Sequence, residues 1–88
     1  METLLVITNC PDEETANAIA LAAVEEKLAA CVNILPRVQS IYRWQGKVES
    51  ASEIPLFFKS TAANYPALET RIRELHPYEL PEIIALPL

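Results

Sequence analysis

TLLVITNCPDEE, residues 3–14, leads from an apolar run directly into the start of a helix. The four consecutive apolar residues Leu4–Ile7 predict a strand that is covered on both faces. A strand with one solvent-exposed face would instead show alternating apolar and polar residues. Pro11 ends this strand. The acidic residues 12–14 favour a helix start, since carboxylates stabilise the positive end of a helix dipole. The stretch therefore predicts a β-α unit at the beginning of the chain.

The rest of the chain alternates between extended and helical patterns. Pro36 interrupts the second apolar run, because proline removes a backbone donor from a strand. Gln45-Gly46 predicts a turn; glutamine is a poor first residue of a type I′ turn, so we expect Gly46 to be left-handed beside a bulge. Either Thr61 or Asn64 caps the second helix. Extended segments are predicted at residues 31–35, 38–44, 47–60 and 82–88, and helices at residues 12–28 and 65–76.

This order of elements predicts an α+β fold. It is the β-α-β-β-α-β pattern of a ferredoxin-like sandwich, with two helices on one face of a four-stranded, mostly antiparallel sheet. The hairpin from Val38 to Ser60 is long for a chain of 88 residues. No helix is left for the second sheet face, yet Leu4–Ile7 and Ile83–Leu86 are apolar at consecutive positions. We therefore expect this face to be buried against other copies of the chain, with the hairpin paired to a neighbouring sheet edge.

The composition is that of a single globular domain covering residues 1–88. Hydrophobic residues make up 51% of the chain, which is enough to bury a core and argues against disorder. The net charge of −5, without a basic run, argues against partners such as nucleic acid or an anionic membrane. Two cysteines are too few for a disulfide-stapled secreted scaffold, and no signal peptide or membrane-spanning stretch is visible. We expect a cytoplasmic protein with both thiols reduced.

Three side chains are candidate metal ligands. His76 is the only histidine and ends the second helix; from the residues alone, a protonated ring at the negative helix end is favoured over metal binding. Cys10 lies at a strand end, so we expect it to be accessible and able to bind copper with His76 if the fold brings them together. Cys31, in an apolar run, is expected to be a buried small hydrophobe. No nucleophile motif or phosphate loop is present, so no enzymatic activity is predicted.

Aromatic and charged residues cluster at the tip of the hairpin, in YRWQGK at residues 42–47. Strand alternation places Tyr42 and Trp44 on one face and Arg43 on the other. Cross-strand packing at the tip is one interpretation. A tryptophan beside a turn is also a good interface anchor, so we favour an interface role for Tyr42, Arg43, Trp44 and Gly46.

Three motifs in this chain resemble those of the CutA divalent-cation tolerance proteins. They are EKLAACVNI at residues 26–34, SIYRWQGK at residues 40–47 and HPYELPEI at residues 76–83. Their order and spacing match the family, and the resemblance runs through essentially the whole chain. The motif residues that it singles out, besides those of the hairpin tip, are Cys31, Asn33, Pro77, Tyr78, Pro81 and Glu82.

The resemblance implies a ferredoxin-like subunit in a homotrimer, similar to the PII signalling proteins in fold and assembly. It implies a link to copper and other divalent cations, no catalytic activity and no required cofactor. Among metal ligands, His76 matches the family histidine before the Pro-Tyr pair; Cys10 lies in the region of the family cysteine, and Thr8 is the competing position. Family members usually continue into a short final helix, which residues 1–88 do not include.

Two functions from different classes follow from the resemblance. The first is a homotrimeric binding protein for divalent-cation (copper) tolerance. The alternative is a PII-like sensor trimer that binds a small metabolite in an intersubunit cleft. An anionic or nucleotide ligand would need converging basic groups, and the chain offers few, which lowers the alternative. The candidates for such groups are Arg37, Arg43, Lys47 and Lys59.

Overall fold

The computed structural model describes residues 2–88 and contains two helices and a five-stranded antiparallel sheet. The elements are β1 (Thr3–Cys10), α1 (Glu13–Glu25), β2 (Cys31–Ile34), β3 (Val38–Trp44), β4 (Lys47–Thr61), α2 (Tyr65–Leu75) and β5 (Ile83–Pro87). The predicted α+β ferredoxin-like class is confirmed. The expected four strands become five, because the segment around Pro36 separates β2 from β3.

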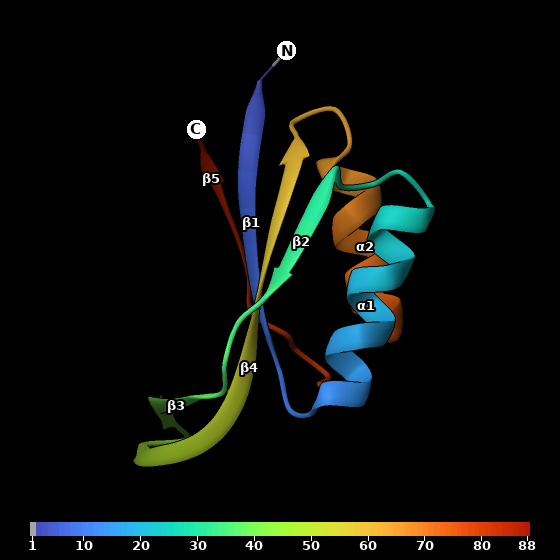
Figure 1. The fold of residues 1–88 in the computed structure, drawn as a ribbon. Helices are drawn as coiled ribbons and strands as arrows, with labels where there is room; N and C mark the ends of the chain where they lie inside the picture. Colours follow the sequence, from blue (N-terminus) through green and yellow to red (C-terminus); the bar gives the residue numbers. More distant parts are fainter. Residues whose placement is uncertain (1) are drawn as a thin grey trace.

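Both helices lie on the same side of the sheet, to its right in Figure 1. The strand order is β2-β4-β1-β5, and β3 pairs with the other part of β4. In β1 the residues that face the helices are buried and alternate with half-buried ones. The core between the sheet and the helices consists mainly of Leu4, Val6, Cys10, Ala16, Ile19, Ala23, Ala29, Ile54, Leu56, Phe58, Leu68 and Ile72.

The sheet face away from the helices is open in the single chain. Cross-strand partners share a face, and the pairs Leu5↔Leu86, Ile7↔Ile84 and Ile7↔Phe57 place an apolar stripe on this side. We call Leu5, Ile7, Phe57, Ile84 and Leu86 the open-face stripe. In the single chain only one face of the Leu4–Ile7 strand packs against helices, so burial of the other face against neighbouring copies stays a prediction.

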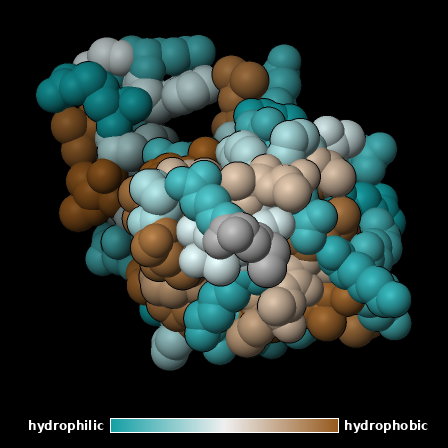
Figure 2. Space-filling model, turned by 90° about the horizontal axis from the view of Figure 1, so that it is seen from above, coloured by the Kyte–Doolittle hydropathy of each residue, from teal (hydrophilic) through white to brown (hydrophobic). Residues whose placement is uncertain are grey.

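The long strand β4 belongs to two ladders. Residues 54–61 pair with β1, and residues 47–53 pair with β3. The β3–β4 hairpin consequently projects from the body of the subunit, at the upper left of Figure 2. Apolar residues, brown in this view, lie on the hairpin and on the adjoining left flank of the body, the side on which β5 lies in Figure 1.

The hairpin turn differs from its prediction. Trp44 pairs with Lys47, so the loop has two residues, and Gln45 and Gly46 have φ values of 50° and 80°. Two successive positive φ values define a type I′ turn, the form that matches the twist of two paired strands. The predicted bulge is therefore wrong: the twist of the ladder outweighs the poor left-handed propensity of glutamine.

The helix ends follow local hydrogen-bonding rules. The Asp12 carboxylate accepts a hydrogen bond from the Thr15 N–H at 2.7 Å and caps α1. At the other end, Lys27 is left-handed with φ 61°, and the Leu28 N–H donates to the Ala23 carbonyl at 2.9 Å. None of the helices in the part of the chain described is long and apolar enough to cross a membrane.

The start of α2 is supported by Thr61, three residues before the N-cap Asn64. Thr61 Oγ1 accepts a hydrogen bond from the Asn64 N–H at 3.2 Å, while the Asn64 side chain makes no cap hydrogen bond. Of the two capping candidates, Thr61 therefore supports the turn into the helix, through a short turn rather than a direct cap.

Candidate functional site

The segment after α2 is tied to the end of β1 through His76. The His76 Nε2 atom lies 2.6 Å from the Asn9 carbonyl oxygen, and Nδ1 accepts a hydrogen bond from the Tyr78 N–H at 3.1 Å. A carbonyl oxygen can only accept, so Nε2 carries the proton and the ring is neutral in this arrangement. The ring is also buried, with 6% of the residue exposed. His76 therefore fixes the position of Tyr78.

Tyr78 contacts a buried carboxylate on β4. Its hydroxyl donates to Glu53 Oε2 at 3.0 Å, and its ring lies 4.6 Å from the His76 ring, centroid to centroid. Burial, followed by the hydrogen bond to Glu53 and the charge of that carboxylate, raises the pKa of Tyr78 to about 12. The buried Thr8 hydroxyl donates to the Glu82 carbonyl at 2.7 Å and holds the far end of the segment against β1.

These contacts form one wall of a cleft of about 800 Å³, and the β3–β4 hairpin forms the other. We call it the Glu53 cleft. Of the described residues that line it, three are glutamates, three are aromatic and none is basic. The lining residues are Asn9, Ser40, Ile41, Tyr42, Trp44, Glu53, Tyr78, Glu79, Leu80 and Glu82.

Glu53 is the least exposed of the charged residues in this cleft. Only 8% of it is exposed, and Tyr78 is its one hydrogen-bond partner among the described residues. Its carboxylate is absent from the ion pairs found within residues 2–88, which all involve Arg71 or Arg73. A buried carboxylate with a single neutral partner carries a desolvation cost that one hydrogen bond compensates only in part.

The predicted metal ligands do not form a ready-made copper site. Cys10 is fully buried, and burial, with smaller contributions from Asp12 and Glu53, raises the pKa of its thiol to about 11. Metals bind the thiolate, so a protonated thiol is a poor ligand at neutral pH. Both nitrogens of His76 are already hydrogen-bonded. Within residues 2–88 no group of three or more metal-ligating side chains converges.

The cysteine exposures are the reverse of those that the sequence predicts. Instead of being accessible, Cys10 faces the helices from the end of β1 and is buried in the core. Instead of being buried, Cys31 is half-buried on the open face, opposite Lys59. The alternation of β1 decides this, because Cys10 shares its face with Leu4 and Val6. Thr8, the competing position, is also buried and donates its hydroxyl to Glu82.

The hairpin residues of the sequence prediction divide between the cleft and the opposite face. Tyr42 and Trp44 line the Glu53 cleft, and Trp44 is 54% exposed. Arg43 alternates with them and points to the other face, and Gly46 lies in the turn.

The motif residues of the resemblance lie at two places in the fold. Asn33 is exposed on β2, next to the half-buried Cys31. Tyr78 and Glu82 line the cleft, with Pro77 exposed between His76 and Tyr78, and Pro81 buried.

Sequence reasoning did not identify Glu53, Asn9, Glu79 or Leu80 as site residues. A signal for Glu53 exists, since a carboxylate directly before the apolar run Ile54–Phe58 must enter the sheet with its neighbours. Glu79 and Leu80 belong to the motif at residues 76–83, but they lie in an irregular segment where no periodicity indicates which way a side chain points.

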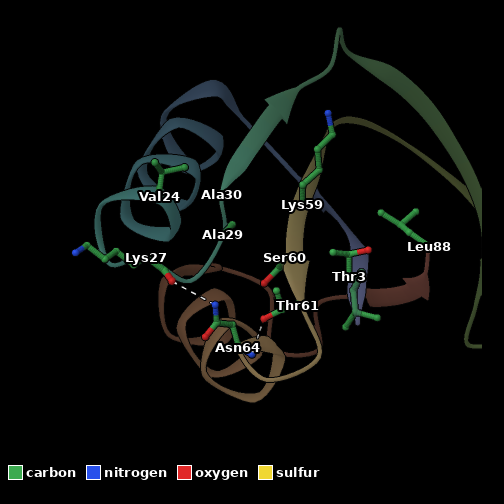
Figure 3. A pocket seen from close by; sticks show the side chains of 11 residues that line it. Thr3, Val24, Lys27, Ala29, Ala30, Lys59, Ser60, Thr61, Asn64 and Leu88 are labelled. Atoms are coloured by element: carbon green, nitrogen blue, oxygen red, sulfur yellow. Dashed lines mark hydrogen bonds between the residues drawn. The ribbon is translucent and has the colours of Figure 1, made fainter. Parts of the chain in front are cut away.

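A second hollow, of about 570 Å³, lies at the opposite end of the sheet. Figure 3 shows its walls, formed by the end of α1 around Val24 and Lys27, by Ser60 and Thr61 of β4, and by Leu88. The Asn64 amide donates to the Lys27 carbonyl at 3.5 Å across it. The surface of this hollow is mostly apolar, and Lys27 and Lys59 are the charged residues among the described ones that line it.

The basic residues considered for an anionic ligand do not converge. Lys59 lines the hollow of Figure 3. Arg37 donates to the Pro11 carbonyl at 3.3 Å, at the base of the hairpin. Arg43 and Lys47 lie near the hairpin tip. No described lining residue of the Glu53 cleft is basic, so the arrangement disfavours an anion there.

Comparison with known proteins identifies the family. A family model described as CutA1 divalent ion tolerance protein matches residues 4–88. This chain belongs to the CutA1 family. The divalent-cation tolerance protein CutA of Thermus thermophilus is 53% identical over 88 residues, which cover all of this chain and 84% of that relative. The human protein CutA is 50% identical over 78 residues, or 89% of this chain and 44% of the human one. This CutA1 chain thus spans less than half the length of the human relative.

Solved CutA1 structures have the same fold. The divalent cation tolerance protein from Thermus thermophilus superimposes with a TM-score of 0.96 at 51% identity, covering 98% of this chain and 84% of that one. CutA from Xylella fastidiosa gives a TM-score of 0.96 at 45% identity, covering all of this chain and 85% of that one. These two solved CutA1 structures therefore share the fold of this chain.

Proposed function

We propose that this chain acts in tolerance to divalent cations, copper among them, as a non-catalytic cytoplasmic homotrimer that needs no cofactor. The observation that carries the proposal is the match of residues 4–88 to a family named for divalent ion tolerance. The open-face stripe supports the assembly, because an uncovered apolar sheet face is unfavourable in a soluble monomer.

The test of the role is growth in raised copper. A bacterial host without its own CutA1 protein is complemented with this chain, with the His76→Ala variant or with an empty vector. We expect the intact chain to improve growth at inhibitory Cu²⁺ concentrations and to leave growth without added copper unchanged. Identical growth of the intact chain and the empty vector would contradict a tolerance role.

Direct copper binding at His76 and Cys10 is a finer part of the proposal. Because both ring nitrogens of His76 are hydrogen-bonded, copper must displace either the Tyr78 N–H from Nδ1 or, with the ring proton moved to Nδ1, the Asn9 carbonyl from Nε2. We expect His76→Ala to weaken Cu²⁺ binding at least about tenfold, or about 1.4 kcal/mol, in a calorimetric titration. Glu14→Gln, at the exposed start of α1, is the control. Equal affinities would leave His76 as a positioning residue for Tyr78.

A second candidate function is a PII-like sensor trimer that binds a small metabolite. The Glu53 cleft favours it, because its volume of about 800 Å³ is in the range of small-molecule sites. The alternative places the metabolite between subunits, and the mouth of this cleft is formed by the projecting hairpin, the element proposed to reach a neighbouring copy.

A further inference from the structure

We propose that the Glu53 cleft binds a small organic ammonium cation between the aromatic rings of the hairpin and the buried Glu53 carboxylate. This inference rests on the second candidate function, for which it names a ligand class, and it is independent of copper binding. The cleft is built by one chain, from β3, β4 and residues 78–82.

The charge of the lining sets the sign of the ligand. Three glutamates line the cleft, and none of the described lining residues is basic. Glu53 is the decisive one, since it is 8% exposed and only Tyr78 donates to its side chain among the described residues. A cation that reaches this carboxylate offsets its desolvation cost, whereas an anion would add to it.

The aromatic residues favour an organic cation. Tyr42, Trp44 and Tyr78 all line the cleft, and the rings of tyrosine and tryptophan attract cations through their π faces. Quaternary ammonium groups are recognised in this way, because they carry a charge on an apolar surface that gives up its water easily.

The same lining is poorly suited to a bare metal ion. A divalent cation such as Ca²⁺ takes six to eight oxygen ligands, roughly, and no group of three ligating side chains converges within residues 2–88. The cleft offers one fixed carboxylate and apolar rings instead of a cage.

The position of the receiving groups is fixed before any ligand arrives. Tyr78 is held from one side by His76, through the 3.1 Å bond to its N–H, and from the other by Glu53 at 3.0 Å. Thr8 anchors Glu82 at 2.7 Å. A wall held at three points loses little conformational entropy on binding, which favours affinity for a small ligand.

The test uses choline chloride as the probe and its neutral isostere 3,3-dimethylbutan-1-ol as the matched comparison. Trp44 is the only tryptophan, so intrinsic fluorescence of the assembled protein reports directly on the cleft. Titrations are carried out at constant ionic strength. We expect choline to give a saturable change and the isostere to bind at least about tenfold more weakly.

Variants distinguish binding in the Glu53 cleft from a general effect of the protein's net charge. Glu53→Gln keeps an acceptor for Tyr78 and is expected to weaken choline at least about fivefold, while Glu14→Gln, with the same loss of charge on α1, leaves it unchanged. Tyr42→Leu, on an exposed strand position, removes one ring without touching the core and is also expected to weaken choline. It serves in place of Glu53→Gln should that variant not fold.

Four results would overturn the proposal. They are no saturation up to about 10 mM choline, equal affinity for the neutral isostere, equal weakening by Glu14→Gln and Glu53→Gln, and displacement of choline by an equal concentration of CaCl₂. A cleft filled by a neighbouring copy would give the first of these. None of them bears on copper tolerance, which the growth assay tests separately.

Discussion

His76 uses both ring nitrogens within the protein, which changes how a lone histidine is interpreted. Its position at the end of α2 suggests a protonated ring at the negative helix end, and the family resemblance suggests a metal ligand. A protonated ring would lose the bond from the Tyr78 N–H, and a metal would displace either that bond or the one to Asn9. The structure gives the residue a third role, because its hydrogen bonds and ring contact hold Tyr78 beside Glu53.

The two thiols are expected to react in the order opposite to that suggested by the sequence. Cys31 is half-buried, whereas Cys10 is fully buried and its thiol has a pKa raised to about 11. Burial and the raised pKa both slow the reaction of Cys10, and the greater exposure of Cys31 favours its labelling. We expect a thiol reagent at pH 8 to label Cys31 first, as followed by peptide mass spectrometry, and guanidinium chloride to remove the difference. Faster labelling of Cys10 in the native protein would contradict the burial described here.

The Tyr78–Glu53 hydrogen bond predicts a loss of stability at alkaline pH. The pKa of Tyr78 is raised in the folded state from about 10 to about 12, so folding favours the neutral phenol. Its contribution is complete below pH 10 and is lost as the pH rises from about 10 to about 12. We expect Tyr78→Phe to lower the free energy of unfolding at pH 8 by about 1 kcal/mol, the value of one hydrogen bond.

The pH dependence of that difference is the decisive measurement. Chemical unfolding of the wild type and of Tyr78→Phe is compared at several pH values from 8 to 12, roughly, and the difference in stability is expected to shrink above pH 10. The raised pKa of Cys10 makes both proteins less stable above pH 9 by a similar amount, so it cancels in the comparison. A difference that stays constant with pH would show that the hydroxyl does not act through its proton.

At the scale of single elements, the β3–β4 turn should be open to improvement. Gln45 has a φ of 50°, a left-handed conformation that asparagine adopts more readily than glutamine. We expect Gln45→Asn to raise the free energy of unfolding by about 0.5 kcal/mol. Gly46→Ala should lower it by about 1 kcal/mol, because Gly46 has a φ of 80° and gains a side chain there. Thermal unfolding of the three proteins checks both signs, and a stabilising alanine would contradict the turn type.

The helices and strands could be predicted well from local sequence patterns, whereas the type of the hairpin turn and the burial of Cys10 could not. Apolar runs and helical spacing place every strand and helix near its observed bounds, because burial dominates at those positions. The turn at Gln45 departs from the prediction because the twist of the β3–β4 ladder determines the turn type. The burial of Cys10 depends on the face that β1 turns to the helices, and an unbroken apolar run does not reveal that face.

The candidate site was predictable only in part for a related reason. Tyr42, Trp44 and Tyr78 stand out as aromatic residues in motifs, and the structure brings them to one cleft. Their common partner Glu53 comes from a different segment, and its pairing with Tyr78 spans 25 residues of sequence. Long-range juxtaposition of this kind depends on sheet register, which local periodicity does not specify.

At the scale of the whole molecule, the two faces of the sheet differ, because helices cover only one of them. α1 and α2 cover one face, and the open-face stripe lies on the other, with Ile84 41% and Leu86 45% exposed in the single chain. The projecting hairpin lengthens the molecule to 41 Å along one axis, against 25 Å and 22 Å along the others. An uncovered apolar face and a projecting hairpin are two surfaces through which copies of the chain can associate head to tail.

We therefore expect this chain to be a homotrimer in solution, with the number three taken from the family resemblance. Size exclusion with light scattering should give the mass of three chains at micromolar concentration. Ile84→Glu places a charge in the open-face stripe and is expected to shift the mass towards one chain, while Leu21→Glu, at a 60% exposed position on α1, leaves the trimer intact.

Trp44→Ala should lower the thermal stability of the trimer, because removing an aromatic anchor from an interface costs about 2 kcal/mol or more. A wild-type mass of one chain would refute the assembly, whereas a trimer whose stability is unchanged by Trp44→Ala would refute only the anchor.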